Sequence, residues 1–110
     1  MPEAIEIQLK KGALELCVLA LLHQRDNYAY EIASALADAI GMGEGTIYPL
    51  MRRLQAERLV ETYLEESPSG PPRKYYRLTD AGRQSFNIQK DAWSSFSGAV
   101  DQIVFGGAKA

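Results

Sequence analysis

The chain has 110 residues, 46% of them hydrophobic, and a formal net charge of −2. It is long enough for one compact core, and its longest apolar cluster is too short to span a bilayer, so we expect no membrane partner. A single cysteine excludes an internal disulfide and a cysteine-rich metal site. Because the N-terminus also lacks the pattern of a signal peptide, the expected location is the cytoplasm.

The first predicted helix spans residues 10–24, after a loose start or a first helical turn at residues 1–8. Between residues 14 and 22 the helix is apolar on nearly all sides, and such a helix has to be buried all round. We therefore expect one side to pack against its own domain and the other side against a second subunit. Cys17 is expected to be inert, because burial raises the pKa of a thiol, with redox sensing as the alternative. His23 is expected to be a surface or capping residue.

A turn at residues 25–27 precedes a second predicted helix over residues 28–40. Its inner face is expected to carry Ile32, Leu36 and Ile40, which are spaced by one helical turn. Glycines directly after this helix end it, since glycine readily takes the left-handed conformation that often follows a helix.

The third predicted helix is the most informative segment. Its apolar residues recur at the i, i+3, i+4, i+7 spacing of a helix with one buried face and are Ile47, Leu50, Met51 and Leu54. The opposite face carries Tyr48, Pro49, Arg52 and Arg53. The helix is expected to start near Gly45 or Thr46. With Thr46 as N-cap, Pro49 would lie in the first turn, where its missing N–H costs nothing. An earlier start would cost one hydrogen bond, and the helix is expected to end near Arg58.

Residues 60–65 and 73–78 have strand patterns on either side of a loop at residues 67–72, and they predict a β-hairpin. Thr79 is expected to cap a last helix that runs to about Val104, before a pair of glycines. The predicted fold is therefore mainly α with a small β-hairpin. A helix, a short turn, a basic helix and a basic hairpin form the layout of a winged helix-turn-helix, whose second helix enters the DNA major groove.

The charges are distributed unevenly along the chain. Residues 45–83 carry seven cations and five acids, whereas the remainder is acidic. Phosphates are contacted by small hydroxyls, backbone N–H groups and cations, which the hairpin supplies through Ser69, Gly70, Arg73 and Lys74. Base reading is expected from the start of the third helix, where an arginine can bind guanine with two hydrogen bonds, and the residues that can reach a base edge are Thr46, Tyr48 and Arg52. The alternative is an ordinary solvated surface.

The last helix carries an apolar seam at heptad spacing. Its members are Phe86, Trp93, Phe96, Val100 and Ile103. A seam over more than two heptads requires a partner helix, and Gln89 interrupts it. We therefore expect a packed dimer helix instead of a regular coiled coil, with Trp93, Phe96, Val100 and Ile103 in the dimer interface.

Three separate blocks, residues 28–32, 45–54 and 70–79, resemble the PadR family of bacterial transcriptional regulators in their order and spacing. The resemblance covers nearly the whole chain, and the short C-terminal helix is similar to that of the compact subfamily. It implies a homodimeric winged-helix repressor that binds a double-stranded DNA operator. Residues 1–80 would form the winged helix-turn-helix DNA-binding region, and residues 81–110 a C-terminal dimerisation helix packed on the same single domain.

The resemblance also completes the set of expected DNA contacts. These are Thr46, Tyr48, Pro49, Arg52, Arg53, Ser69, Gly70, Arg73, Lys74 and Tyr76.

The multidrug-sensing LmrR-type branch of that family is similar in placing a tryptophan on the last helix, where two such residues sandwich flat aromatic drugs. The resemblance implies that Trp93 lines a pocket for a planar aromatic or phenolic molecule, which releases the repressor from its operator. Because Lys90 and Ser97 flank Trp93, a neutral or anionic ligand is expected over a cationic one. The expected ligand-binding residues are Trp93, Phe86, Lys90, Ser97, Leu16 and Ala20. Alternatively, Trp93 only fills the dimer core.

Catalysis has no candidate residues in this sequence. No nucleophile elbow, phosphate-binding loop, dinucleotide-binding fingerprint or pair of catalytic acids is present, so we expect no enzymatic activity, no cofactor and no metal. The competing hypothesis for function is a winged-helix module that binds another protein and has no operator or ligand of its own.

Overall fold

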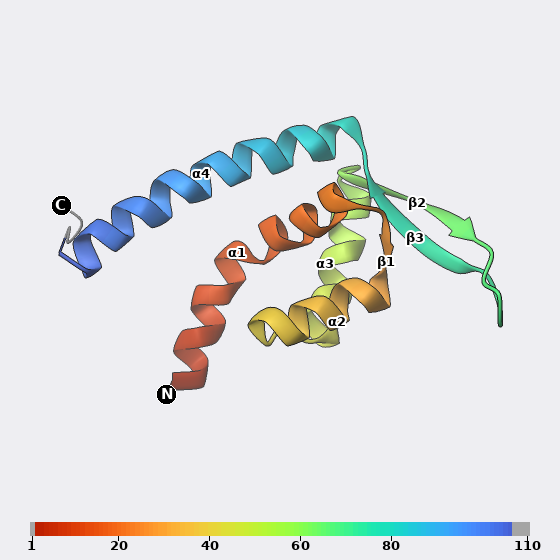
Figure 1. The fold of residues 1–110 in the computed structure, drawn as a ribbon, viewed down its shortest axis with the longest axis horizontal. Coiled ribbons are helices and arrows are strands. Elements are labelled where there is room, and N and C mark those ends of the chain that lie inside the picture. The colour runs from red at the N-terminus through yellow and green to blue at the C-terminus, as the bar shows by residue number, and fades with distance from the viewer. Residues whose placement is uncertain (1, 107–110) are drawn as a thin grey trace.

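The computed structural model describes residues 2–106 and, for side chains, residues 9, 10 and 12–106. Over this part of the chain, four helices pack with a three-stranded antiparallel sheet, and the hairpin projects from the body as a wing (Figure 1). In chain order the elements are α1 (Pro2–Gln24), β1 (Asn27–Tyr28), α2 (Ala29–Ile40), α3 (Glu44–Ala56), β2 (Val60–Glu65), β3 (Arg73–Leu78) and α4 (Asp80–Val104). The predicted fold class is confirmed.

Strand β3 lies at the centre of the sheet, between β1 and β2. The hairpin register runs from Val60 opposite Leu78 to Glu65 opposite Arg73. Val60 is buried, but Leu64, on the same face by alternation, is 70% exposed. The outer part of the hairpin extends beyond the core, and both of its faces are therefore solvated.

The short strand β1 was not expected from the sequence, which predicts only a turn at residues 25–27. Asn27 and Tyr28 pair with Tyr76 and Tyr75 of β3. A strand of two residues has no periodicity of its own, so its existence depends on a partner that lies far along the chain.

The hydrophobic core lies where α1, α2 and α3 meet the sheet and the start of α4. Its buried apolar members are Leu14, Val18, Leu19, Leu22, Ile32, Ala33, Leu36, Met42, Ile47, Met51, Leu54, Val60, Tyr76, Leu78 and Phe86. The far half of α4 extends past this core (Figure 1). None of the helices described is long and apolar enough to cross a membrane.

Helix α1 begins at Pro2, well before the predicted start at residue 10. Proline is favoured at the first helical position because its φ suits a helix and its missing N–H would be unpaired there in any case. This start signal was present in the sequence.

Helix α3 also begins earlier than predicted, at Glu44, and Thr46 is not its N-cap. Gly43 is the N-cap, and its carbonyl accepts hydrogen bonds from the backbone N–H groups of Thr46 and Ile47, each at 3.1 Å. Pro49 therefore lies inside the helix and cannot donate to the carbonyl four residues before it. The helix therefore lacks one backbone hydrogen bond. Glu44 lies at the N-terminus of the helix, where the positive end of the helix dipole favours an acid.

The end of α2 and the start of α4 agree more closely with the sequence prediction. Gly41 has a φ of 72° and ends α2 in the left-handed conformation, as predicted. Thr79 caps α4 and accepts a hydrogen bond from the backbone N–H of Gly82 at 3.0 Å. The glycine stop predicted after α4 is described only for Gly106, which has a φ of 74°, since Gly107 lies outside the described residues.

The start of α4 is fixed against the turn that precedes β2. The Thr79 hydroxyl donates to the carbonyl oxygen of Arg58 at 2.7 Å, and the backbone N–H of Thr79 donates to that of Leu59 at 3.1 Å. Gly82 packs so closely here that an added Cβ would overlap the Leu59 carbonyl. Only glycine fits, because the atom in the way belongs to the backbone.

We expect Gly82→Ala to lower the free energy of unfolding by about 1–3 kcal/mol, the usual cost of overpacking a close contact. Gly98→Ala on the same helix is the matched control, since nothing lies within 4 Å of its added Cβ. The control should raise helix stability by about 0.5–1 kcal/mol. Urea denaturation followed by circular dichroism measures both, and equal effects of the two substitutions would contradict the assigned contact.

Candidate nucleic-acid interface and adjoining pocket

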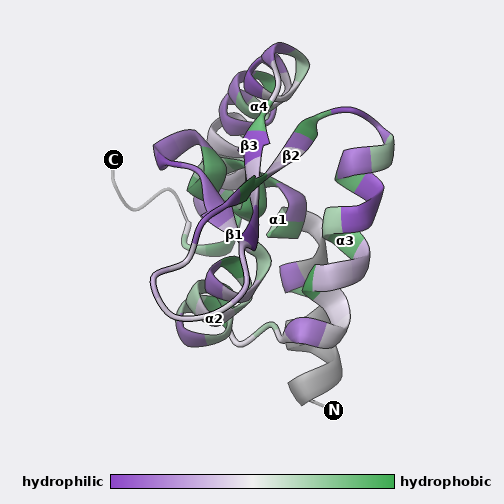
Figure 2. Cartoon of the chain, turned by 90° about the vertical axis from the view of Figure 1, so that its right-hand side faces the viewer, coloured by the Kyte–Doolittle hydropathy of each residue, from purple (hydrophilic) through white to green (hydrophobic). Residues whose placement is uncertain are grey.

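Helix α3 has the two faces that its sequence predicts. Ile47, Met51 and Leu54 are buried, and Leu50, the fourth residue of the predicted apolar face, is half-buried. Pro49 and Arg52 are exposed. Thr46 and Tyr48 are half-buried near the start of the helix. Hydrophilic residues of α3 and of the wing both show in the view that faces the wing (Figure 2).

The two arginines of α3 differ in their partners. Arg53 binds Glu15 of α1 at 2.7 Å and Glu57 at 3.0 Å. Arg52 is exposed, and no described carboxylate forms an ion pair with it. Arg52 is therefore available to an external anion, whereas Arg53 joins α3 to α1. Both were predicted to contact DNA, and the geometry favours only Arg52.

The cations of the wing also differ in their partners. Arg73 and Lys74 are exposed and, among the described side chains, have no carboxylate partner. Arg77, by contrast, binds Glu61 at 2.9 Å. Ser69 and Gly70 are exposed in the loop of the hairpin. The hydroxyl, the backbone amides and the two unpaired cations thus lie where the sequence analysis expected phosphate contacts.

Three tyrosine rings pack next to one another on the outer face of the sheet. Tyr75 lies between Tyr28 and Tyr63, with ring centroids 5.4 and 5.8 Å away. Arg73 lies 4.7 Å from the centroid of the Tyr28 ring and donates a hydrogen bond to its hydroxyl at 3.1 Å. The Tyr63 hydroxyl donates to Asp26 at 2.7 Å, which raises the pKa of Tyr63 to about 12. These contacts hold Arg73 on this face, whereas the Lys74 ammonium lies on the other face, 5.6 Å from the centroid of the Tyr76 ring.

Tyr76 does not belong to this face. Its side chain is 5% exposed and packs in the core, so the expectation that it contacts DNA is corrected. Strand alternation places it opposite to Tyr75, and only the tertiary packing shows which of the two faces is buried.

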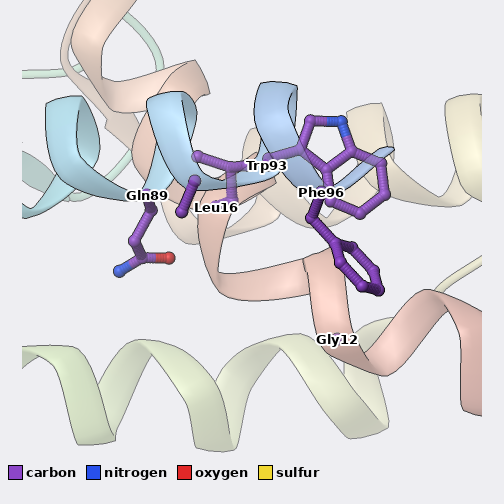
Figure 3. A pocket seen from close by; sticks show the side chains of 6 residues that line it. Gly12, Leu16, Gln89, Trp93 and Phe96 are labelled. Atoms are coloured by element: carbon purple, nitrogen blue, oxygen red, sulfur yellow. The ribbon is translucent and has the colours of Figure 1, made fainter. Parts of the chain in front are cut away.

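A pocket of about 250 Å³ lies between α1 and α4 (Figure 3). It is lined by Gly12, Leu16, Gln89, Ala92, Trp93 and Phe96. A second hollow of about 540 Å³ continues along α4, where Trp93 and Phe96 are joined by Ser97, Val100 and Asp101, with Leu9 and Gly12 from α1. Trp93 is 47% exposed and Phe96 64%, so a large aromatic surface is open to a ligand or to another chain.

The predicted ligand-binding residues divide into two groups. Trp93, Leu16 and Ser97 line the two hollows, whereas Ala20, Phe86 and Lys90 line neither.

Phe86 is 8% exposed and stacks on His23 with centroids 4.5 Å apart. The ammonium of Lys90 lies 5.6 Å from the centroid of the Phe86 ring. The charged residue that does line the α4 hollow is Asp101. The preference for an anionic ligand, which rested on Lys90, is therefore corrected.

Sequence analysis missed a polar connection between three helices. The Gln89 amide donates to Glu15 at 2.9 Å and to Ser85 at 2.9 Å, while Arg53 binds the other oxygen of Glu15 at 2.7 Å. Two signals were available. Glu15 is a lone carboxylate in an apolar helix, and Gln89 interrupts the seam of α4.

A third hollow, of about 540 Å³, lies on the α3 side of this connection. Its lining residues are Gly12, Leu14, Glu15, Thr46, Pro49, Leu50, Arg53 and Gln89. Gly12 and Gln89 line both this hollow and the pocket beside Trp93.

The remaining candidate residues have structural surroundings. Burial raises the pKa of the Cys17 thiol, which disfavours the reactive thiolate. His23 is exposed on the surface near the end of α1, as expected. Among the described side chains no group of His, Cys, Asp and Glu has the arrangement of a metal site.

The comparisons with known proteins come from a family match and from solved structures. The sequence matches the transcriptional regulator PadR-like family over residues 18–88. It is similar to a PadR-like transcriptional regulator from Bacillus cereus, with 38% identity and a TM-score of 0.82 over 88% of this chain and 96% of that one. A Streptococcus transcriptional regulator shows 35% identity and a TM-score of 0.79 over 87% of this chain and 96% of that one. Bacillus subtilis PadR in complex with operator DNA is similar in fold alone, with 24% identity and a TM-score of 0.61 over 69% of this chain and 45% of that one.

We expect the Glu15 connection to lose its stabilising effect in acid. Burial tends to raise the pKa of Glu15, but the hydrogen bonds from Arg53 and Gln89 outweigh it and hold the pKa below 4.5. A folded-state pKa below the unfolded one contributes stability above about pH 4.5, and this contribution is lost as the pH falls through the folded value. Denaturation of wild type and Glu15→Gln should therefore show a stability difference at pH 7 that shrinks toward pH 3. A difference that is constant over this range would contradict the ionised connection.

Proposed function

This chain belongs to the PadR-like family of transcriptional regulators, and from that premise we propose that it is a homodimeric DNA-binding repressor released by a small aromatic molecule. Members of this family are regulators of transcription and not enzymes. The observation that carries the DNA-binding part is that Arg52 on α3 and Arg73 and Lys74 on the wing are exposed and have no carboxylate partner among the described side chains.

The DNA contacts follow from where those cations lie. We propose that α3 enters the major groove, with Arg52 reading a base edge and Thr46, Tyr48 and Pro49 beside it. Ser69, Gly70, Arg73 and Lys74 of the wing contact phosphates, which fixes the position of α3 in the groove. The fold is shared with Bacillus subtilis PadR, which is solved in complex with operator DNA. The partner is thus double-stranded DNA, and a location in the cytoplasm follows from that partner.

The dimer is supported by the apolar surface of α4. Phe96 is 64% exposed and Ile103 81% in the single chain, and Leu9 of α1 is 73% exposed at the same hollow. Exposed apolar patches of this kind mark interaction surfaces. We propose that α4 packs on α1 and α4 of a second copy through Trp93, Phe96, Val100 and Ile103, in the two-fold manner of most homodimers.

The ligand is supported by the pocket beside Trp93. A planar ring stacked on the indole would be enclosed when a second copy closes the open side of the hollow. Because Asp101 lines the adjoining hollow along α4 and Lys90 lines neither hollow, a neutral or cationic aromatic molecule suits the site better than an anionic one.

A winged-helix module that binds another protein, without an operator or ligand, is the alternative. Such a module would show no retention on duplex DNA and no saturable binding of aromatic molecules. The two proposals are therefore separated by the experiments below.

We expect Arg52→Ala and Lys74→Ala to weaken DNA binding in different ways. Loss of Arg52 removes a base contact and should cost about 1–3 kcal/mol on the preferred duplex, with little change on random duplexes. Loss of Lys74 should weaken both equally and lower the salt slope by about one.

Electrophoretic shifts on both kinds of duplex measure these changes. Arg77→Ala is the control, because Arg77 is a wing arginine bound to Glu61 and its loss should change neither affinity greatly. An equal loss on the two duplexes for Arg52→Ala would exclude Arg52 from base reading.

We expect planar aromatic compounds to quench the fluorescence of Trp93, the only tryptophan of the chain, in a saturable way. Stacking on an aromatic face contributes about 0.5–1.5 kcal/mol beyond area burial. Trp93→Ala should abolish this binding while light scattering still reports a dimer. If quenching is non-saturating and Trp93→Ala instead dissociates the dimer, Trp93 only fills the interface.

A further inference from the structure

Glu15 joins three helices through the two oxygens of its carboxylate. It lies in an apolar stretch of α1, and its side chain is 26% exposed. One of its oxygens accepts from Arg53 of α3 and the other from Gln89 of α4. Among the hydrogen bonds between described side chains, these two are the ones that join α1 to the other helices.

This carboxylate lines the hollow beside α3 and binds Gln89, which also lines the pocket beside Trp93. The pocket beside Trp93 and the hollow beside α3 share Gly12 and Gln89 as lining residues. Gly12 has no side chain, and nothing lies within 4 Å of the Cβ that it lacks. The Gln89 amide points away from the indole of Trp93 (Figure 3). A group that extends from a ring on Trp93 along this shared wall would approach Gln89 and, through it, the Glu15 oxygen that Gln89 binds.

We propose that Glu15 couples the ligand pocket to the DNA-binding helix, because a hydrogen-bond donor on the ligand competes with Arg53 for its carboxylate. This inference rests on the proposed function. The ligand class that it names is a planar aromatic ring with a protonated amine, placed one or two bonds from the ring.

The competition has a direct consequence for α3. When Glu15 binds Arg53, the middle of α3 is attached to α1, which packs against α4. When the ligand amine takes the carboxylate, Arg53 retains only Glu57 of its own segment, so α3 loses its polar attachment to α1. A ligand shifts an equilibrium only through its different affinity for two states. Here that difference is the Glu15–amine contact, which forms only in the state without the Glu15–Arg53 pair.

Reciprocity follows from the same competition. DNA that requires the attached position of α3 should weaken amine binding by the same factor by which the amine weakens DNA binding. A ring without the amine occupies the Trp93 pocket but leaves Glu15 with Arg53, so it should affect DNA binding much less.

The experiment uses two probes that share a ring, 1-naphthylmethylamine and 1-ethylnaphthalene. Binding to the protein is measured by calorimetry. The affinity for a fluorescein-labelled duplex, enriched from random DNA by binding to this protein, is measured by anisotropy with and without each probe. The variants are wild type, Glu15→Gln, and Glu61→Gln as the control, since Glu61 forms an ion pair with Arg77 on the wing, away from the pocket.

In wild type and Glu61→Gln, saturating naphthylmethylamine should weaken DNA binding about fivefold or more, within the usual range of coupling, and ethylnaphthalene should weaken it far less. In Glu15→Gln, both probes should still bind, and their effects on DNA affinity should become equal. A structural role of Glu15 would lower stability without removing this difference between the probes.

The failures are distinguishable. If both probes bind and Glu15→Gln keeps the full difference between them, the coupling role of Glu15 is overturned while the proposed function stands. If neither probe binds wild type, the ligand pocket is overturned and the coupling with it. If no duplex binds, the proposed function itself fails.

Discussion

Helix α1 buries Leu14, Val18, Leu19 and Leu22 at the centre of the molecule, and α2, α4 and β3 all pack against it. Full burial of a side chain of this kind contributes about 1.5–3 kcal/mol, so α1 supplies a large share of the core. The wing and α3, the two elements that we propose to face DNA, are both positioned relative to this helix. Strand β3 carries the wing, and Arg53 attaches α3 through Glu15.

Ion pairing on this surface decides which cations are available to a partner. Arg53 and Arg77 are bound by carboxylates, whereas Arg52, Arg73 and Lys74 have none among the described side chains. The net charge of −2 therefore conceals a local arrangement that can attract phosphates. The energy of any one exposed ion pair is small. The pairs matter here because they neutralise some cations and leave others available to a partner.

The polar connection at Glu15 and the apolar surface of α4 both involve the seam of α4, because Gln89 interrupts that seam and binds Glu15. The seam residues that face away from the core leave a hollow beside Trp93, and Gln89, which interrupts the seam, points instead to the carboxylate on α1. We propose that the first feature serves dimer and ligand and that the second carries the response to α3. A fully apolar seam would pack more tightly but would leave no polar route between the two sites.

The sequence by itself determined the elements whose patterns are local. Helical spacing predicted the buried face of α3, strand alternation predicted the hairpin, and Thr79 and Gly41 marked helix boundaries as the structure has them. Three ordered blocks also identified the family. These signals are readable because a single buried face, or a single capping residue, leaves a mark within a few positions of the chain.

Only the tertiary structure decided which partners those elements meet. Strand β1 exists because β3 pairs with it, Tyr76 is buried while Tyr75 is not, and Arg53 binds Glu15 from another helix. Lys90 lies over Phe86 of its own helix. The physical reason is the same in each case, since a side chain's partner is set by how distant elements pack, and periodicity along one element carries no information about that packing.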